Sequence, residues 1–296
     1  MKVSFYNLGC KVNFAELSQI EQQFRGRGYE IVQFGEKSDI VLINTCTVTN
    51  NADADSRKVI RKARRENPDA FIGVLGCYVQ VDPGAVKEID GVDAIFGTKE
   101  KFNILDKIDK FEHLQETRDF VTDTKELQFD AANSVNSLDH SRVFMKIQDG
   151  CDYKCTYCII PKARGGGRSM PFTEIRTKLD EFQSRGFREV ILSGINLGEY
   201  KAPTGENFTD VIRMIAEMEP NLRFRISSIE PNLLNDEIID IVASSEAFCN
   251  HFHVPLQSGS PEILRKMRRR YNRGLYRERI MKVYETIPNC GIGIDV

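Results

Sequence analysis

The chain has 296 residues, of which 41% are hydrophobic and 28% are charged, as in an ordinary globular protein. This length suffices for two domains with separate cores. The formal net charge of -2 gives no overall attraction to nucleic acid, so any RNA contact must come from local basic patches. No apolar run approaches the roughly 20 residues of a membrane span, and the N-terminal residues are too polar for a signal peptide. We therefore expect a cytoplasmic protein with no membrane association.

Strands and helices alternate through the first hundred residues. The expected strands are VSFYNLG (3–9), YEIVQ (29–33), DIVLINT (39–45), FIGVLG (71–76) and AIFG (94–97). The expected helices cover 16–28, 55–67 and a segment that begins at 82–89. Such alternation is typical of a parallel sheet with helices on both faces. We predict an N-terminal, doubly wound α/β domain over residues 1–111.

Residues 112–140 are polar and lose this alternation, so we expect a linker there. Strand candidates resume at 142–148, 189–194, 222–228, 250–256 and 291–296, with helices expected at 172–186 and 209–219. This order is that of a (β/α) barrel, in which functional residues lie at the carboxyl ends of the strands. We predict such a barrel over residues 141–296. Because GIGIDV stops within a strand, we expect the barrel to be incomplete at its C-terminus and the sequence to be a fragment.

A compact cysteine motif follows the first barrel strand. In a reducing compartment, the chain's eight cysteines indicate metal binding or catalysis more than disulfides. Cys151, Cys155 and Cys158 can bind three irons of a four-iron cluster and leave the fourth iron open. That iron could bind the amino and carboxylate groups of S-adenosylmethionine (SAM). The alternatives are three unrelated loop cysteines or a zinc site, but zinc needs a fourth ligand and the closest histidine, His140, precedes the strand.

Three further cysteines each follow an expected strand of the N-terminal domain. Cys10, Cys46 and Cys77 end the segments YNLGC, LINTC and VLGC. The carboxyl ends of parallel strands share one edge of the sheet, where ligands bind. We therefore expect the three thiols to converge on a second iron–sulfur cluster. Small buried residues at strand ends are the alternative.

Several motifs resemble those of the radical-SAM methylthiotransferases. They are LGCKVN (8–13), NTCTVT (44–49), LGCY (75–78), QDGCDYKCTYCIIPKARG (148–165), SGINLGEY (193–200), RISSIEP (225–231) and HFHVPLQSGS (251–260). The forms CKVN and QDGCDYKCTYCIIP are most similar to the branch that acts on N6-threonylcarbamoyladenosine in tRNA. The isopentenyladenosine and ribosomal-protein branches have different residues around the same cysteines.

This resemblance implies a tRNA-modifying enzyme with two [4Fe-4S] clusters. Cys10, Cys46 and Cys77 would hold the auxiliary cluster, and Cys151, Cys155 and Cys158 the SAM cluster. One SAM would methylate sulfur, and a second would give the radical that removes hydrogen from adenine C2, where a methylthio group is placed. An aromatic C–H bond resists acid–base chemistry, so a radical cofactor suits the task. The implied partners are the tRNA anticodon loop and an electron donor such as flavodoxin or ferredoxin. The sulfur donor is not identified.

The resemblance also suggests which residues contact SAM. SGINLGEY corresponds to the family's glycine motif, so we expect backbone groups there to meet the methionine amino group. Glu230 would accept hydrogen bonds from the ribose hydroxyls. The full expected set is Tyr157, Ser193, Gly194, Ile195, Glu230, Gln257 and Ser258. For each of these loop residues, a purely local hydrogen bond to the backbone is the alternative.

Two basic clusters are candidates for tRNA contact. Arg57, Arg61 and Arg65 recur on one helix face, although a solvated face would look the same. The second cluster is RKMRRRYNR (265–273), in which Tyr271 could stack on a base. The family continues beyond GIGIDV with another barrel segment and a small β-barrel domain that helps to bind tRNA. Two other functions stay open: methylthiolation of a ribosomal-protein aspartate, and iron–sulfur electron transfer or binding without radical chemistry.

Overall fold

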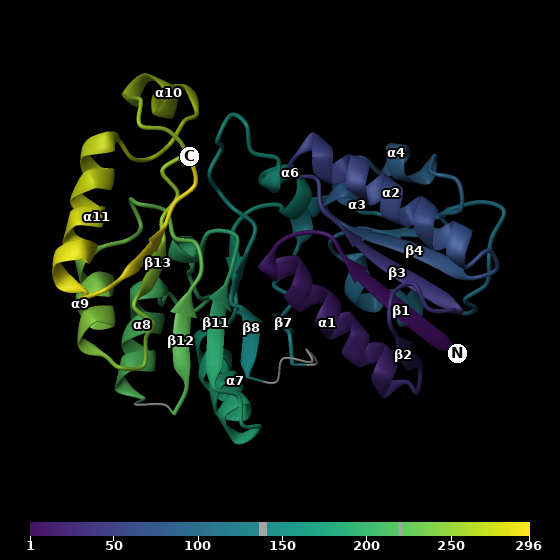
Figure 1. The fold of residues 1–296 in the computed structure, drawn as a ribbon, viewed down its shortest axis with the longest axis horizontal. Coiled ribbons are helices and arrows are strands. Elements are labelled where there is room, and N and C mark those ends of the chain that lie inside the picture. The colour runs from purple at the N-terminus through teal and green to yellow at the C-terminus, as the bar shows by residue number, and fades with distance from the viewer. Residues whose placement is uncertain (136–140, 219–220) are drawn as a thin grey trace. The chain divides into compact units, whose positions relative to one another are not determined.

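A computed structural model describes residues 1–135, 141–218 and 221–296, which form two compact units (Figure 1). The first unit consists of Met1–Leu127, a short piece that contains β7 (Ala132–Asn133), and Ile159–Gly165. The second contains Gln128–Ala131, the stretch that ends at Cys158, and Gly166–Val296. Among the described residues, no helix is both long and apolar enough to cross a membrane.

A six-stranded parallel sheet forms the centre of the first unit, in the order β2–β1–β3–β4–β5–β6. Its strands are β1 (Lys2–Asn7), β2 (Glu30–Val32), β3 (Ile40–Thr45), β4 (Phe71–Gly76), β5 (Ala94–Phe96) and β6 (Arg118–Phe120). This is the strand order of a flavodoxin-like, doubly wound fold. The predicted parallel sheet is confirmed.

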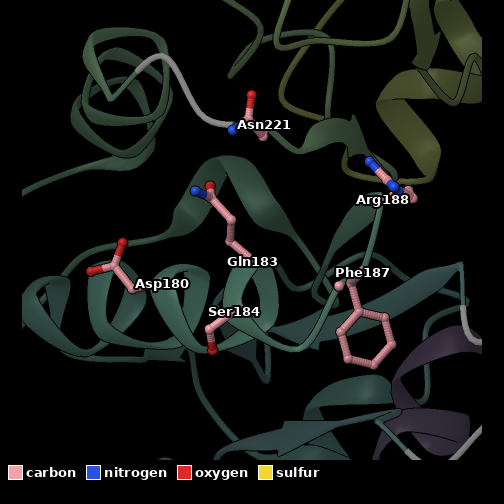
Figure 2. A pocket seen from close by; sticks show the side chains of 7 residues that line it. Asp180, Gln183, Ser184, Phe187, Arg188 and Asn221 are labelled. Carbon is pink, nitrogen blue, oxygen red and sulfur yellow. The ribbon is translucent and has the colours of Figure 1, made fainter.

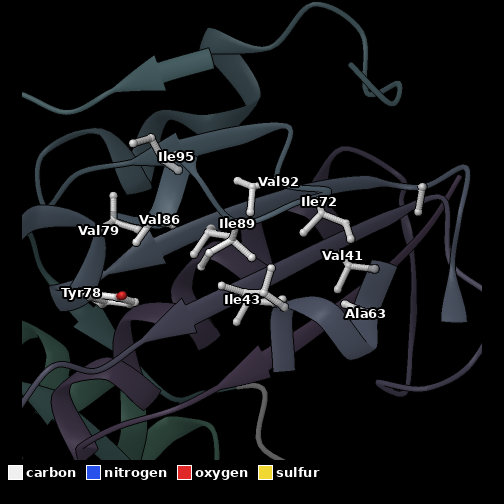
Figure 3. Close-up of a cluster of buried hydrophobic side chains, with 13 residues drawn as sticks. Val41, Ile43, Ala63, Ile72, Tyr78, Val79, Val86, Ile89, Val92 and Ile95 are labelled. Carbon is white, nitrogen blue, oxygen red and sulfur yellow. The ribbon is translucent and has the colours of Figure 1, made fainter. Parts of the chain in front are cut away.

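The two faces of this sheet carry separate hydrophobic cores, because alternate side chains of a strand point to opposite faces. On one face, Val41 and Ile43 pack with helices α2 (Asn50–Glu66), α3 (Cys77–Val81) and α4 (Pro83–Lys87) (Figure 3). On the other face, Ile40 and Leu42 pack with α1 (Lys11–Gly26) and α5 (Ile104–Lys107), which follows the 3-10 helix η1 (Glu100–Asn103). The helices that follow β1 and β3 therefore lie on opposite faces of the sheet.

The second unit repeats a strand–helix order. Strands β8 (Arg142–Lys146), β11 (Glu189–Ser193) and β12 (Arg223–Ile226) lie parallel, and β13 (His251–His253) pairs in parallel with β14 (Gly291–Gly293). Single bridges, Phe224–Phe248 and Ser228–His253, join β12 to the β13 segment. The intervening helices are α7 (Phe172–Ser184), α8 (Phe208–Glu217), α9 (Asp236–Ser244), α10 (Pro261–Lys266) and α11 (Arg273–Thr286). The predicted (β/α) order is confirmed.

Short elements surround the cysteine motif of the second unit. After β8 come β9 (Gln148–Asp149) and then the cysteine loop, and β9 pairs antiparallel with β10 (Arg168–Ser169). Helix α6 (Ile160–Arg164) lies between them in sequence but belongs to the first unit. A 3-10 turn, η3 (Leu197–Glu199), follows β11.

Part of the segment expected to be a linker is folded. Strand β6 extends the sheet of the first unit, where Phe120 stacks on Phe96 with ring centroids 5.3 Å apart. A short 3-10 helix, η2 (Thr124–Glu126), follows it. The polar composition concealed this edge strand, because an edge needs few apolar residues. Residues 136–140 of the expected linker, His140 among them, lie outside the described residues, as does Glu219 of the helix expected at 209–219.

Candidate functional site

The three cysteines of the first unit stand at the carboxyl ends of neighbouring strands. Cys10 immediately precedes α1, Cys46 follows β3, and Cys77 is the first residue of α3. The last paired residues of these strands are Asn7 with Asn44 and Thr45 with Gly76, so the strands end at the same level. Helix α1 follows β1 and helix α2 follows the neighbouring β3, and the two helices cover opposite faces of the sheet. This edge is therefore the topological switch point, where doubly wound folds bind ligands.

Two asparagines join the loops that carry these cysteines. The side-chain nitrogen of Asn13 donates to the backbone carbonyl of Thr45 at 3.1 Å, and the side-chain nitrogen of Asn44 donates to the backbone carbonyl of Asn13 at 2.9 Å. The Cys10 thiol in turn lies 3.7 Å from the Asn13 side-chain oxygen. The motifs CKVN and NTC therefore contain asparagines that fix the loop positions, a role that the sequence analysis missed.

Two of the three thiols of this unit are partly or wholly desolvated, since Cys77 is buried and Cys46 half-buried, whereas Cys10 is exposed. Burial raises the pKa of Cys46, and burial also raises the pKa of Cys77. The Cys10 thiol adds to the rise in pKa of both cysteines. A buried thiol resists ionisation until a metal replaces its proton. This edge is therefore suited to cysteines that ionise as they bind metal.

The second cysteine group lies on one loop after β9. Cys155 is buried and Cys151 and Cys158 are half-buried, and none of the three forms a disulfide. The sulfur of Cys151 accepts from the Tyr153 amide at 3.4 Å and lies 4.0 Å from the Asn196 side-chain nitrogen. Burial raises the pKa of Cys151 to about 12, and the nearby Glu199 acts in the same direction. A backbone donor and a side-chain donor thus already point at the Cys151 sulfur, as donors do around cluster thiolates.

Arg269 is the central contact residue of this loop. Its guanidinium donates to the Cys155 sulfur at 3.3 Å and to the Tyr157 hydroxyl at 3.3 Å, and it also pairs with Glu230. Burial raises the pKa of Glu230, while the charge of Arg269 opposes that rise. The carboxylate expected to meet a ribose is thus an ion-pair partner of an arginine that touches a cysteine.

The basic segment around Arg269 packs against the cysteine loop. The Thr156 amide donates to the Met267 carbonyl at 3.2 Å, and the Arg270 guanidinium lies 3.9 Å from the centre of the Tyr153 ring. Tyr271 is 6% exposed, and its hydroxyl donates to the carbonyls of Pro255 and Leu256. The expectation that Tyr271 stacks on an RNA base is therefore wrong, because the ring belongs to the core.

The loop after β11 is held by Gln148, which the sequence analysis missed. The Gln148 side-chain oxygen accepts from the amides of Ile195 at 3.0 Å and Asn196 at 2.8 Å, and its nitrogen donates to the Gly150 carbonyl at 2.9 Å. A Cβ on Gly194 would lie 3.0 Å from the Gln148 side chain, so glycine permits this close packing. A ligand amino group donates hydrogen bonds, so in this loop it would meet oxygen acceptors such as backbone carbonyls rather than the Ile195 N–H. Ser193 is buried, and its hydroxyl donates to the Ile191 carbonyl.

Gln257 and Ser258 form a tight turn after β13. Gln257 has a φ of +63°, and its amide donates to the Asp295 carbonyl at 2.8 Å. The Ser258 hydroxyl accepts from the Ser260 amide at 3.1 Å. Left-handed backbone at a non-glycine residue costs free energy and concentrates at functional sites. The turn therefore agrees with a binding role for Gln257, while Ser258 already has a local partner.

A separate open pocket of about 580 Å³ lies elsewhere in the second unit (Figure 2). Asp180, Gln183 and Ser184 of α7 line it, together with Arg188 and Asn221. The last two precede β11 and β12, so this pocket is at the amino ends of the strands. Since barrel enzymes place chemistry at the carboxyl ends, the cysteine loop is the stronger candidate site.

Residues 2–97 match the uncharacterized protein family UPF0004, and residues 145–296 match the radical SAM superfamily. Threonylcarbamoyladenosine tRNA methylthiotransferase MtaB of Bacillus subtilis is 37% identical over 99% of this chain and 66% of its own length. The proteins of the same name from Aquifex aeolicus and Rickettsia prowazekii are 34% and 32% identical over the whole chain, which spans 72% and 68% of them. The chain belongs to the radical SAM methylthiotransferase family. It spans about two thirds of the length of these curated relatives.

Solved structures of other radical SAM proteins share the fold of this methylthiotransferase family member. The methyltransferase TsrM of Kitasatospora setae, solved with cobalamin and a [4Fe-4S] cluster, has a TM-score of 0.62 at 15% identity. It is matched over 99% of this chain and 68% of its own. OxsB, solved with aqua-cobalamin and SAM, has a TM-score of 0.62 at 12% identity, over 99% of this chain and 48% of that one. At these identities the likeness concerns the fold alone.

Membership of the radical SAM family implies SAM and one [4Fe-4S] cluster, and the cysteine loop fits both. Among the described residues, the side-chain oxygens of Asn196 and Asn232 and the Nε of Arg269 are buried without a hydrogen-bond partner. Such atoms around a loop with three thiols suit a polar ligand. Over all of the residues that the structure describes, no three His, Cys, Asp or Glu side chains lie close enough together to hold a single metal ion. Cluster thiolates each bind a different iron, so they need not meet at one point.

Proposed function

We propose that this chain is the catalytic part of a tRNA methylthiotransferase that converts N6-threonylcarbamoyladenosine, next to the anticodon, to its 2-methylthio derivative. The observation that carries this proposal is the pair of cysteine triads in a chain of this family, one at the carboxyl ends of parallel strands and the other on the loop that follows β8 and β9. The names of the curated relatives support the choice of threonylcarbamoyladenosine.

The second unit carries the SAM site in this proposal. Cys151, Cys155 and Cys158 hold a [4Fe-4S] cluster, which on binding SAM supplies the radical chemistry that an inert aromatic C–H bond requires. Arg269 orders the cysteine loop through Cys155 and Tyr157, and Gln148 fixes the glycine loop beside it. The carbonyls of Gly194 and Ile195, together with the Gln257 turn, then line the space for SAM. Glu230 can reach a ribose only if it shares its carboxylate with Arg269.

The first unit carries the auxiliary cluster in this proposal. Cys10, Cys46 and Cys77 hold it at the switch point, and Asn13 and Asn44 keep their loops in register. These thiols are the other triad that the fold gathers, here at the edge where the parallel strands end.

Helix α2 is the proposed contact for tRNA. Arg61 and Arg65 are exposed on it, with Lys58 and Lys62 beside them, whereas Arg57 turns inward to donate to the Tyr78 hydroxyl at 3.0 Å. Exposed arginines one turn apart can follow a phosphate backbone. We further propose that the enzyme works in the cytoplasm with a low-potential electron donor such as flavodoxin or ferredoxin.

Anaerobic reconstitution of the purified chain tests this function. We expect about eight irons per chain from two four-iron clusters, release of 5′-deoxyadenosine from SAM, and a methylthio group on adenine of threonylcarbamoyl-modified tRNA. Cys155→Ala should lower the iron content to about four per chain, from one remaining four-iron cluster, and abolish SAM cleavage. Cys77→Ala is the matched variant, since it should lower iron equally but preserve SAM cleavage.

Three results would redirect the proposal. Iron without SAM cleavage would favour an electron-transfer or binding protein. SAM cleavage with transfer to a ribosomal-protein aspartate, but not to tRNA, would favour the alternative branch. Zinc in place of iron would contradict radical chemistry altogether.

A further inference from the structure

Three charged side chains lie together in the interior of the first unit. Glu16, Lys101 and Arg164 are each no more than 1% exposed. Lys101 Nζ is 2.7 Å from one Glu16 oxygen, and the Arg164 guanidinium grips both Glu16 oxygens at 3.0 Å. Glu16 thus contacts both cations, and the formal charges of these three side chains sum to +1.

The three residues come from distant parts of the sequence. Glu16 lies on α1, six residues after Cys10, and Lys101 lies on η1. Arg164 is the last residue of α6, six residues after Cys158, the final cysteine of the SAM loop. Helix α6 packs on α3, which begins with Cys77, and the Thr98 hydroxyl anchors it by donating to the Ala163 carbonyl at 2.8 Å.

Hydrogen bonds and helix packing connect this charged group to the parts of the first unit that carry Cys10 and Cys77. The Asn13 side-chain oxygen accepts from both Arg164 and the Cys10 thiol, which links that cysteine to the group. Burial raises the pKa of Cys77, and the charges of Arg164 and Lys101 oppose the rise. Burial also raises the pKa of Cys46, where Arg164 again opposes it. The group is therefore close enough to act electrostatically on these sulfurs.

We propose that Arg164 and Lys101, held by Glu16, form a buried cationic group that compensates the negative charge of a cluster bound in the first unit and sets its reduction potential. The ligands of that cluster are Cys10, Cys46 and Cys77. The inference rests on the proposed function in that these cysteines bind a cluster. Three thiolates on a cubane bring net negative charge into a desolvated site, where a nearby fixed cation is poorly screened. Net charge near a cluster is one of the determinants of its potential. Arg164 and Lys101 are positioning residues here, since neither touches a reacting atom.

A purely structural ion pair is the competing explanation, and it makes a different prediction. If the group only stabilises the fold, removal of any member should lower the stability of the first unit, whether the removed charge is positive or negative. If the group acts by charge, removal of a cation and removal of the anion should move the potential in opposite directions. The sign of the shift therefore separates the two explanations.

The experiment uses the full chain with Cys151, Cys155 and Cys158 changed to alanine, so that only the first-unit cluster contributes. Iron content is measured first, and the midpoint potential is then measured by electron paramagnetic resonance during a redox titration. We expect Lys101→Met and Arg164→Gln to lower the potential, because a cation that stabilises the reduced, more negative cluster is lost. Glu16→Gln should raise it. Each change should alter the redox equilibrium about tenfold, which is 59 mV for a one-electron couple.

Conservative and compensating variants complete the test. Arg164→Lys keeps the charge, so its potential should stay near that of the parent, and the exposed Lys62→Met should change nothing because solvent screens it. If single variants lose iron, Glu16→Gln combined with Lys101→Met removes one charge of each sign and should restore binding at the parent potential. Shifts of the same sign for Glu16→Gln and Lys101→Met, or a double variant that does not recover, would overturn the inference. An iron-free parent would instead refute the auxiliary cluster.

Discussion

Gly76, at the end of β4, is the residue whose replacement should most directly disturb the first cysteine site. Its φ is +102°, and a Cβ there would lie 2.4 Å from the Asn44 side-chain oxygen and 2.5 Å from the Thr45 carbonyl. The position therefore combines a backbone conformation that favours glycine with a close approach of two neighbouring strands. Cys77 follows it directly, so the cluster ligand depends on this geometry.

Backbone strain alone costs about 1–3 kcal/mol, and we expect Gly76→Ala to lower the free energy of unfolding by more than this amount. Gly205→Ala is the matched control, because Gly205 has a φ of +113° with no atom within 4 Å of its Cβ position. The two variants differ in the clash alone, so urea denaturation should separate the two costs. Equal losses would show that the strands yield to accommodate the methyl group.

The ion pair of Arg269 with Glu230 is a second place where a substitution should lower the free energy of unfolding by a defined amount. Arg269 is 5% and Glu230 14% exposed, so Arg269→Met leaves a buried carboxylate without its cation. We expect a loss of about 3–5 kcal/mol in unfolding free energy. Arg269→Met combined with Glu230→Gln should lose clearly less, and a double-mutant cycle from thermal and urea unfolding measures the coupling. Additive losses would mean that the pair does not interact in solution.

At the scale of elements, β11 and β12 are joined by a charged cross-strand group. Glu189 accepts from Arg223 at 2.9 Å and from Arg225 at 3.1 Å, two residues on the same face of β12. Burial of Glu189 raises the pKa of its carboxyl, but the arginines outweigh burial and hold it below the ordinary value of 4.5. A lowered carboxyl pKa adds stability above 4.5 and loses it as the pH falls through the folded-state pKa.

We therefore expect Glu189→Gln to destabilise the chain by about 1.5–3 kcal/mol at pH 7 and to flatten the loss of stability on acidification. Thermal unfolding between pH 7 and pH 3 measures both effects. The exposed pair of Glu181 with Lys178 is the control, and Glu181→Gln should cost only about 0–1 kcal/mol. A parallel pH dependence for the parent and Glu189→Gln would contradict the assignment.

At the scale of the whole molecule, the chain forms two compact units, and each carries its own group of three motif cysteines. A cluster that binds only the folded state stabilises the unit that carries it. Loaded chain should therefore show slower amide hydrogen exchange than apo chain in β3 and β4 of the first unit and in β8 and β11 of the second.

Variants should assign this protection to one unit at a time. We expect Cys77→Ala to abolish the gain in β3 and β4 only, and Cys155→Ala to abolish it in β8 and β11 only, as measured by mass spectrometry of exchanged peptides. Loss of protection in both units with either variant would show that the clusters stabilise the chain as one body.

Much of the molecule followed from local sequence pattern. The alternation of apolar strands and helices predicted both parallel sheets, and the spacing of Cys151, Cys155 and Cys158 placed three thiols on one loop. These features depend on residues a few positions apart, which share an element or a turn. The strand-end positions of Cys10, Cys46 and Cys77 also followed, because parallel strands end on a common edge.

The tertiary structure decided the remainder. It turned Tyr271 into a core residue, paired Glu230 with Arg269, and buried Arg164 of α6 against Glu16, 148 positions earlier in the chain. No local pattern marks such contacts, because the partners are chosen by packing and charge compensation between distant segments. The sequence alone therefore determined which elements form and where the thiols stand, whereas the surroundings of those thiols depended on how the chain folds back on itself.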